Sequence, residues 1–165
     1  MIKALLKPAL ARPSLFIALV SAIFLAIAYG FQYNGYAPCE LCWYQRYPYM
    51  AIVALMMVAM ALKVQNSKLL LLLVTLLALI DAGIAGFHVG VEYKWWEGLS
   101  TCGGAFDLSN IELTMDSLYN SAQKVVRCDE PAWTLGNISM AGYNMLAALS
   151  LAVFGLYALK VGKAK

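Results

Sequence analysis

The sequence predicts an all-α membrane protein, a four-transmembrane-helix bundle with two long loops on the outer side and both termini on the inner side. Three observations lead to this fold class: the composition, the length of the uncharged segments and the uneven distribution of charge. Of the 165 residues, 62% are hydrophobic and only 13% are charged, whereas soluble domains average about 45–50% apolar and about 25% charged residues. A soluble core cannot take up this excess, so a lipid-embedded chain is expected.

The apolar residues are gathered into runs long enough to span a bilayer. The spans are expected at residues 14–31, 44–62, 69–91 and 138–159, with outer loops at 32–43 and 92–137. Ser14 to Phe31 holds 18 residues without a charge, about 27 Å as a helix. Because a backbone in lipid must satisfy its own hydrogen bonds, helices are the natural assignment. At this length a single membrane domain, 1–165, is expected.

Charge is divided between the two sides of the predicted bundle. Eight of the twelve basic residues, and no acidic residue, lie in the termini and the middle turn: Lys3, Lys7, Arg12, Lys63, Lys68, Lys160, Lys163 and Lys165. Residues 32–46 and 92–137 hold eight of the nine acidic residues. By the positive-inside rule the first set faces the cytoplasm. Both termini are therefore expected in the cytoplasm, and the two loops in the periplasm of a bacterial inner-membrane protein.

All four cysteines fall in the two outer loops. Cys39 and Cys42 belong to the first loop, and Cys102 and Cys128 to the second. An even number of cysteines, all on the oxidising side of a membrane, indicates disulfide chemistry. Cys39-Glu40-Leu41-Cys42 is a Cys-x-x-Cys motif, whose thiols have a lowered pKa and exchange readily. The sequence therefore predicts a redox-active pair at residues 39 and 42.

The other two cysteines leave alternatives open. A bond between Cys102 and Cys128 would close a loop of about 26 residues, and loop closure of this size stabilises by roughly 3–4 kcal/mol. A structural role fits this pair better than it fits the Cys-x-x-Cys motif. A membrane protein with structural disulfides, or with a four-cysteine metal site, is thus the alternative. The metal site is disfavoured because only one pair has ligand spacing and the compartment is oxidising.

Arg46 lies four positions after Cys42, about one helical turn, at the outer end of the second span. A guanidinium there can stabilise a thiolate at Cys42 and hold a polar headgroup at the membrane surface. The alternative is an arginine that only extends to the interface. The sequence has no haem, flavin or dinucleotide-binding motif, so a lipid-soluble quinone is the expected two-electron acceptor.

Asp81 and His88 are ionisable residues inside the third span. They are seven residues apart, therefore on one helix face and about 10 Å from each other. Reducing a quinone also takes two protons, and ionisable side chains within a span are functional candidates by default, so both residues are candidates for a proton path. His88, the single histidine, lies nearer the outer surface and is expected to contact the quinone. For Asp81 a structural hydrogen bond to Asn144 or Ser150 is an equal alternative.

The segment from Pro38 to Arg46, Pro-Cys-Glu-Leu-Cys-Trp-Tyr-Gln-Arg, resembles a known signature. It is similar to the Pro-Cys-x-Leu-Cys-x-x-x-Arg motif of the disulfide bond formation protein B (DsbB) family. The spacing of Cys102 and Cys128, and the Leu135-Gly136 and Ser139-Met140 pairs, are similar to that family too. The resemblance covers nearly the whole chain. It implies a quinone-dependent protein-disulfide oxidoreductase with ubiquinone or menaquinone as acceptor and a periplasmic thioredoxin-fold oxidase (DsbA-like) as partner.

The resemblance also implies a role for each site residue. The partner's thiolate would attack Cys102 and form a mixed disulfide, after which Cys128 would pair with Cys39. Cys42, released as a thiolate, would contact the quinone in a charge-transfer complex, with Arg46 beside it. His88 is carried over as a quinone-binding residue only weakly, and the family supplies no role for Asp81.

Overall fold

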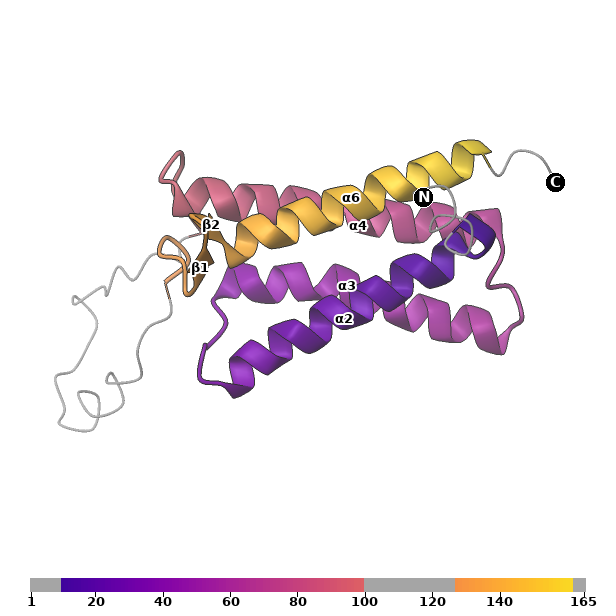
Figure 1. Cartoon of the computed structure of the whole chain (residues 1–165), viewed down its shortest axis with the longest axis horizontal. Helices are drawn as coiled ribbons and strands as arrows, with labels where there is room; N and C mark the ends of the chain where they lie inside the picture. Colours follow the sequence, from indigo (N-terminus) through magenta and orange to yellow (C-terminus); the bar gives the residue numbers. More distant parts are fainter. Residues whose placement is uncertain (1–9, 100–126, 162–165) are drawn as a thin grey trace, which may run out of the picture.

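The computed structural model describes residues 10–99 and 127–161, which form four long helices and one short β-hairpin. Helices α2 (Pro13–Tyr33), α3 (Glu40–Ala61), α4 (Lys68–Glu92) and α6 (Met140–Val161) run alternately up and down the bundle (Figure 1). The start of α2 and the end of α6 lie at one end of the bundle. The turn before α3 and the hairpin lie at the other (Figure 1). The predicted all-helical bundle is thus confirmed for these residues.

Three of these helices, α2, α4 and α6, are long and apolar enough to cross a membrane. Helix α3 has 22 residues, but it carries Glu40, Gln45 and Arg46 in its first two turns and does not reach the same apolarity. The fourth span, and the side of the membrane on which each loop lies, therefore stay predictions.

Local signals determine where two of the helices begin. Pro13 is the first residue of α2, a position where the backbone N–H that proline lacks has no helical partner. Ser67 caps α4, because its side chain accepts a hydrogen bond from the Leu70 backbone nitrogen at 3.2 Å. Both helices agree within two residues with the spans predicted at 14–31 and 69–91.

The second span was predicted to begin at residue 44, and the helix that contains it, α3, begins four residues earlier, at Glu40. Cys39 has an extended backbone, and its sulfur accepts a hydrogen bond from the Cys42 amide at 3.2 Å. This bond caps the helix and satisfies one of its unpaired N–H groups. Hydropathy marks where the apolar residues begin, whereas the cap determines where the helix begins. The Cys-x-x-Cys motif is therefore an N-cap and a first helical turn, not a loop.

The fourth helix begins at Met140, two residues later than the predicted residue 138. Strand β2 (Ile138–Ser139) pairs with strand β1 (Thr134–Leu135) in an antiparallel hairpin. Gly136 and Asn137 connect them, with φ angles of 56° and 64°. Positive φ at both central residues is typical of a tight hairpin turn. The Gly-Asn pair is a hairpin signal that hydropathy does not register.

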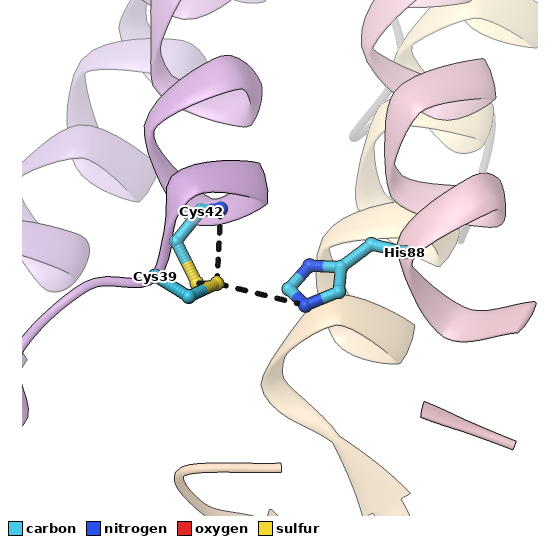
Figure 2. Close-up of side chains that lie close together, drawn as sticks. All are labelled: Cys39, Cys42 and His88. Carbon is cyan, nitrogen blue, oxygen red and sulfur yellow. Dashed lines mark hydrogen bonds between the residues drawn. The ribbon is translucent and has the colours of Figure 1, made fainter. Parts of the chain in front are cut away.

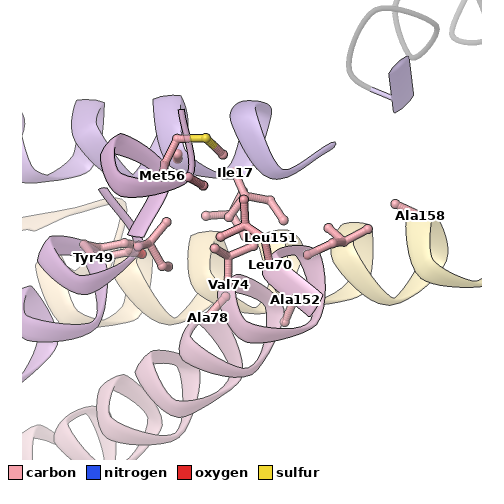
Figure 3. Close-up of a cluster of buried hydrophobic side chains, with 13 residues drawn as sticks. Ile17, Tyr49, Met56, Leu70, Val74, Ala78, Leu151, Ala152 and Ala158 are labelled. Carbon is pink, nitrogen blue, oxygen red and sulfur yellow. The ribbon is translucent and has the colours of Figure 1, made fainter. Parts of the chain in front are cut away.

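One cluster of buried apolar side chains joins all four helices (Figure 3). Its fully buried members come from each helix in turn: Ile17, Ile52, Val74, Ala78 and Ala152. Helices α4 and α6 come close together where Gly155 packs on the Thr75 side chain, with no room for a Cβ atom. Small residues at helix contacts let backbones approach closely in membrane bundles. This packing fixes α4 and α6 relative to α3, and so positions the polar groups near the hairpin end.

Candidate functional site

The two thiols of the Cys-x-x-Cys motif lie together at the start of α3 (Figure 2). Their sulfur atoms are 2.7 Å apart, with the Cys39 thiol donating to the Cys42 sulfur. Both are free thiols; Cys39 is buried and Cys42 half-buried. The pair is therefore held in contact and is ready to close a disulfide.

The hydrogen bond between the thiols makes them unequal acids. Both cysteines precede the span predicted at residues 44–62. The bond to Cys42, together with burial, raises the pKa of Cys39. The same bond lowers the pKa of Cys42, and the positive charge of Arg46 lowers it further, against the opposing effect of burial. Because the thiolate is the reactive form of a cysteine, the lowered pKa favours reactivity at Cys42 over Cys39.

His88 reaches the thiols from α4 (Figure 2). Its Nε2 atom lies 3.7 Å from the Cys39 sulfur and 3.9 Å from Glu92 Oε1. Its Nδ1 atom lies 2.6 Å from Gln45 Nε2 on α3. The ring is buried, and its nearest nitrogen and the two sulfur atoms of Cys39 and Cys42 lie within 4.8 Å of one another. The structure thus brings the histidine into direct contact with the predicted redox pair.

Arg46 lies one turn beyond Cys42 and is buried between α2 and α3, with 6% of its surface exposed. Its guanidinium donates to Gln32 Oε1 at 2.6 Å and to the Ala28 carbonyl at 3.1 Å. The rings of Tyr29 and Trp43 lie 4.7 and 4.8 Å from it. In the part of the chain described, no carboxylate pairs with it. Arg46 is therefore held inside the protein as a positive charge, one helical turn from Cys42.

Cys128 reaches the same place from the segment that precedes the hairpin. It is 1% exposed and packs with Cys39, Leu41 and Val91, with Cys42 against this cluster. Its backbone interacts with His88. Cys128 is disulfide-bonded. Cys102, the fourth predicted cysteine, lies outside the described residues.

A cavity of about 370 Å³ opens beside the thiols. Four of its lining residues are the predicted site residues Cys39, Cys42, Arg46 and His88. Most of the others are apolar or aromatic, among them Phe24, Phe31, Tyr36, Trp133 and Met140. The volume lies in the range of about 300–1,000 Å³ typical of small-molecule sites. An apolar cavity with a few converging polar groups suits a small, largely apolar ligand.

Sequence reasoning missed Gln45 as a partner of the site and assigned Asn144 only to Asp81. Asn144 Nδ2 does donate to Asp81 Oδ2 at 3.1 Å, so that predicted bond is confirmed. Ser150, the other predicted partner, instead bonds the Leu146 carbonyl of its own helix. Asn144 Nδ2 also donates to Gln45 Oε1 at 2.9 Å. The available signal was an amide side chain inside an otherwise apolar run, which requires a buried partner.

The fold is a helical membrane bundle. At one helix N-terminus it holds a free dithiol, beside a buried cation and a small-molecule cavity. These features define a membrane protein with a thiol redox site. The family model described as "Disulfide bond formation protein DsbB" matches residues 11–158. The chain therefore belongs to the disulfide bond formation protein B family, and the predicted resemblance is confirmed.

Relatives of known name agree with this family. The chain is 32% identical over 142 residues to disulfide bond formation protein B of Nitrosococcus oceani, covering 82% of this chain and 83% of that protein. It is 30% identical over 151 residues to disulfide bond formation protein B of Xylella fastidiosa (84% and 79% covered). An uncharacterized protein of Rickettsia prowazekii is 28% identical over 139 residues (82% and 79%). No solved structure gives a significant match. The family and the three apolar helices together support the assignment of this chain as a disulfide formation protein of the bacterial inner membrane.

Proposed function

We propose that this protein reoxidises a periplasmic thioredoxin-fold dithiol oxidase, similar to DsbA, and passes the electrons to ubiquinone or menaquinone. In the overall reaction the partner's two thiols lose two electrons and two protons and become a disulfide. A quinone in the cavity would take up those two electrons and two protons and leave as quinol. Membership of the family supports the disulfide half of this reaction.

The observation that carries the proposal is the position of the Cys39–Cys42 pair on the wall of an apolar cavity. A dithiol that only stabilised the fold would not need a small-molecule cavity beside it. The cavity wall also includes Arg46 and His88. The positive charge of Arg46 fits a quinone oxygen, while the aromatic lining fits the quinone ring.

Electrons would enter through Cys102 and Cys128. The partner's thiolate attacks Cys102, forms a mixed disulfide and releases Cys128, and Cys128 then attacks Cys39 of a Cys39–Cys42 disulfide, which releases Cys42. The partner's second thiolate attacks the mixed disulfide, which closes the partner's own disulfide and frees Cys102. Cys102 then attacks Cys128 of the Cys128–Cys39 bond, which restores the Cys102–Cys128 bond and leaves Cys39 and Cys42 reduced. Packing of Cys128 on Cys39 supports this exchange, since it requires little movement. Free Cys39 and Cys42 with a bonded Cys128 correspond to its final state.

The residues around the reduced pair have distinct tasks in this scheme. Cys42 holds the thiolate, which the Cys39 thiol stabilises by its hydrogen bond. Arg46 provides positive charge near that sulfur and near the negative charge that develops on a quinone oxygen. His88 contacts Cys39, the thiol that donates to the Cys42 sulfur. The aromatic wall excludes water from the reacting atoms.

The same proposal includes the membrane arrangement. With residues 44–62 as a fourth span and both termini in the cytoplasm, the hairpin end of the bundle faces the periplasm, where the partner would be found. The separation of acidic and basic residues along the chain supports this orientation.

Anaerobic oxidation of the reduced protein by quinone tests the proposal. Protein freed of excess reductant is mixed with a short-chain ubiquinone or menaquinone, and quinol is followed by ultraviolet absorbance. One quinol per protein and a new Cys39–Cys42 disulfide, found by alkylation and mass spectrometry, are expected. Cys42→Ser should form none, while the control Ser150→Ala, whose hydroxyl bonds only its own helix, should match wild type. Thiols unchanged by either quinone would reject the quinone-linked function.

The cluster of Cys39, Cys42 and His88 favours a second candidate function, a metal site, because three ligand atoms lie within 4.8 Å. Such a site would have two thiolates and one imidazole, not the four cysteines predicted, since Cys128 is disulfide-bonded. Zinc binding by the reduced protein would be expected, with no quinol formed. Metal analysis of the purified reduced protein distinguishes this candidate from the oxidoreductase.

A further inference from the structure

A continuous line of polar side chains leads from the thiols into the apolar interior of the bundle. Asn144 Nδ2 donates both to Asp81 Oδ2 at 3.1 Å and to Gln45 Oε1 at 2.9 Å. Gln45 Nε2 lies 2.6 Å from His88 Nδ1, and His88 Nε2 lies 3.7 Å from the Cys39 sulfur. Asp81 and His88 are buried, with 0% and 3% of their surface exposed. The proposed reaction so far gives Asp81, Asn144 and Gln45 no task.

The two amides in this line each have one orientation that satisfies their neighbours. Asp81 Oδ2 is an acceptor, so Asn144 must turn its NH₂ group toward it, which leaves Asn144 Oδ1 to accept from the Tyr49 hydroxyl at 2.8 Å. Gln45 then presents its oxygen to Asn144 and its NH₂ group to His88. Since an amide nitrogen only donates, His88 Nδ1 must be the acceptor.

The surroundings of His88 Nε2 lead to the same assignment. The Cys39 sulfur at 3.7 Å and Glu92 Oε1 at 3.9 Å can both accept a hydrogen bond from it, and the ring also has a hydrogen bond to the Cys128 backbone. A neutral imidazole has one N–H, and the bond made by one nitrogen decides which nitrogen carries it. With Nδ1 accepting, the hydrogen lies on Nε2 and points at the thiols.

All donors in the line then point the same way. Asn144 donates to Gln45, Gln45 to His88, His88 toward Cys39, and Cys39 to the Cys42 sulfur at 2.7 Å. Aligned hydrogen bonds polarise one another in a medium of low dielectric constant. The series therefore favours negative charge at its end, on Cys42. Asp81 Oδ2 accepts from Asn144, the first donor, and so keeps this amide in its orientation.

We propose that Asp81, Asn144 and Gln45 are positioning residues, which hold His88 in its Nε2–H tautomer and so direct a one-way series of donors at the Cys42 thiolate. The use of that thiolate rests on the proposed function, but the tautomer does not, since it is present without partner or quinone. This gives a task to a carboxyl group that is fully buried in a membrane-spanning helix, where ionisable side chains are functional candidates.

Nitrogen NMR of the reduced protein, labelled with ¹⁵N-histidine and held in lipid nanodiscs, tests the tautomer. His88 is the single histidine of the chain, so the spectrum reports one ring. The Nε2–H form is expected in wild type at neutral pH. Gln45→Glu places an acceptor against both Asn144 and His88, and should convert the ring to the Nδ1–H form. An Nδ1–H ring in the wild-type spectrum would by itself overturn the proposal.

The far end of the line has its own test. Asp81→Asn keeps the size but can also donate, so a mixture of both tautomers is expected, with the alkylation profile of Cys42 shifted to higher pH. Thr75→Val is the matched control, because Thr75 is buried on the same helix and bonds only the Leu71 carbonyl. A pure Nε2–H ring and an unshifted profile in Asp81→Asn would remove Asp81 from the proposal. A correct tautomer without quinol formation would instead contradict the proposed function alone.

Discussion

Single residues at the start of α3 explain the asymmetry of the thiol pair. Cys39 is at once the cap of the helix, accepting from the Cys42 amide, and a donor to the Cys42 sulfur. Its raised pKa and the lowered pKa of Cys42 have the same first cause, the bond between their sulfur atoms. A helix N-terminus also favours negative charge in its first turn. The difference in acidity between the two thiols thus follows from their positions at the start of a helix, which hydropathy alone does not locate.

The lowered pKa of Cys42 predicts its reactivity as a function of pH. An ordinary thiol titrates at about pH 8.5. Below that pH, Cys42 keeps a larger thiolate fraction than an ordinary thiol. It loses this thiolate only when the pH falls through its own lower pKa. Alkylation of Cys42 at about pH 7 should therefore exceed that of a surface cysteine. Iodoacetamide labelling of the reduced protein, followed by mass spectrometry over a range of pH, measures this.

Variants at Cys39 give the control. Cys39→Ala removes the hydrogen bond that lowers the pKa of Cys42, so the labelling profile should shift to higher pH and the rate at neutral pH should fall. Cys39→Ser retains a hydroxyl donor at this position, so the labelling profile of Cys42 should shift less than in Cys39→Ala. Identical profiles in both variants and wild type would contradict the assignment of that bond as the main cause.

At the scale of elements, three contacts between helices position the site. Helix α4 brings His88 to the thiols of α3, and α6 brings Asn144 to Gln45 of α3 and Asp81 of α4. The contact between α4 and α6 depends on Gly155, which has no side chain where Thr75 lies. This close approach therefore supports both the bundle and the polar line within it.

Gly155→Ala should destabilise the protein, because the added Cβ would overlap the Thr75 side chain. Overfilling a packed contact costs about 1–3 kcal/mol. The free energy of unfolding in mixtures of mild detergent and sodium dodecyl sulfate measures the loss. Gly83→Ala is the matched control on α4, since no described atom lies within 4 Å of the position of its Cβ. Equal stability of the two variants would mean that α4 and α6 are not in close contact at Gly155.

For the whole molecule, much of the fold could be predicted from sequence and less of the site. Long apolar runs are expected to form helices in lipid, so the order and approximate bounds of the four helices could be predicted directly. Arg46 could be assigned to the site because one helical turn separates it from Cys42. The contact of His88 with Cys39 could not be predicted, because it depends on which faces of α3 and α4 meet. Gln45 was missed because its partners lie on two other helices, at no regular spacing.

The central claim is that electrons from a thioredoxin-fold dithiol leave through Cys42 to a quinone. The most direct measurement is anaerobic quinone reduction by the purified protein with an excess of reduced partner, followed by ultraviolet absorbance in wild type and Cys42→Ser. The account predicts many quinols per wild-type protein, one partner disulfide for each quinol, and no turnover in the variant. Turnover that survives in Cys42→Ser, or partner oxidation without quinol in wild type, would contradict it.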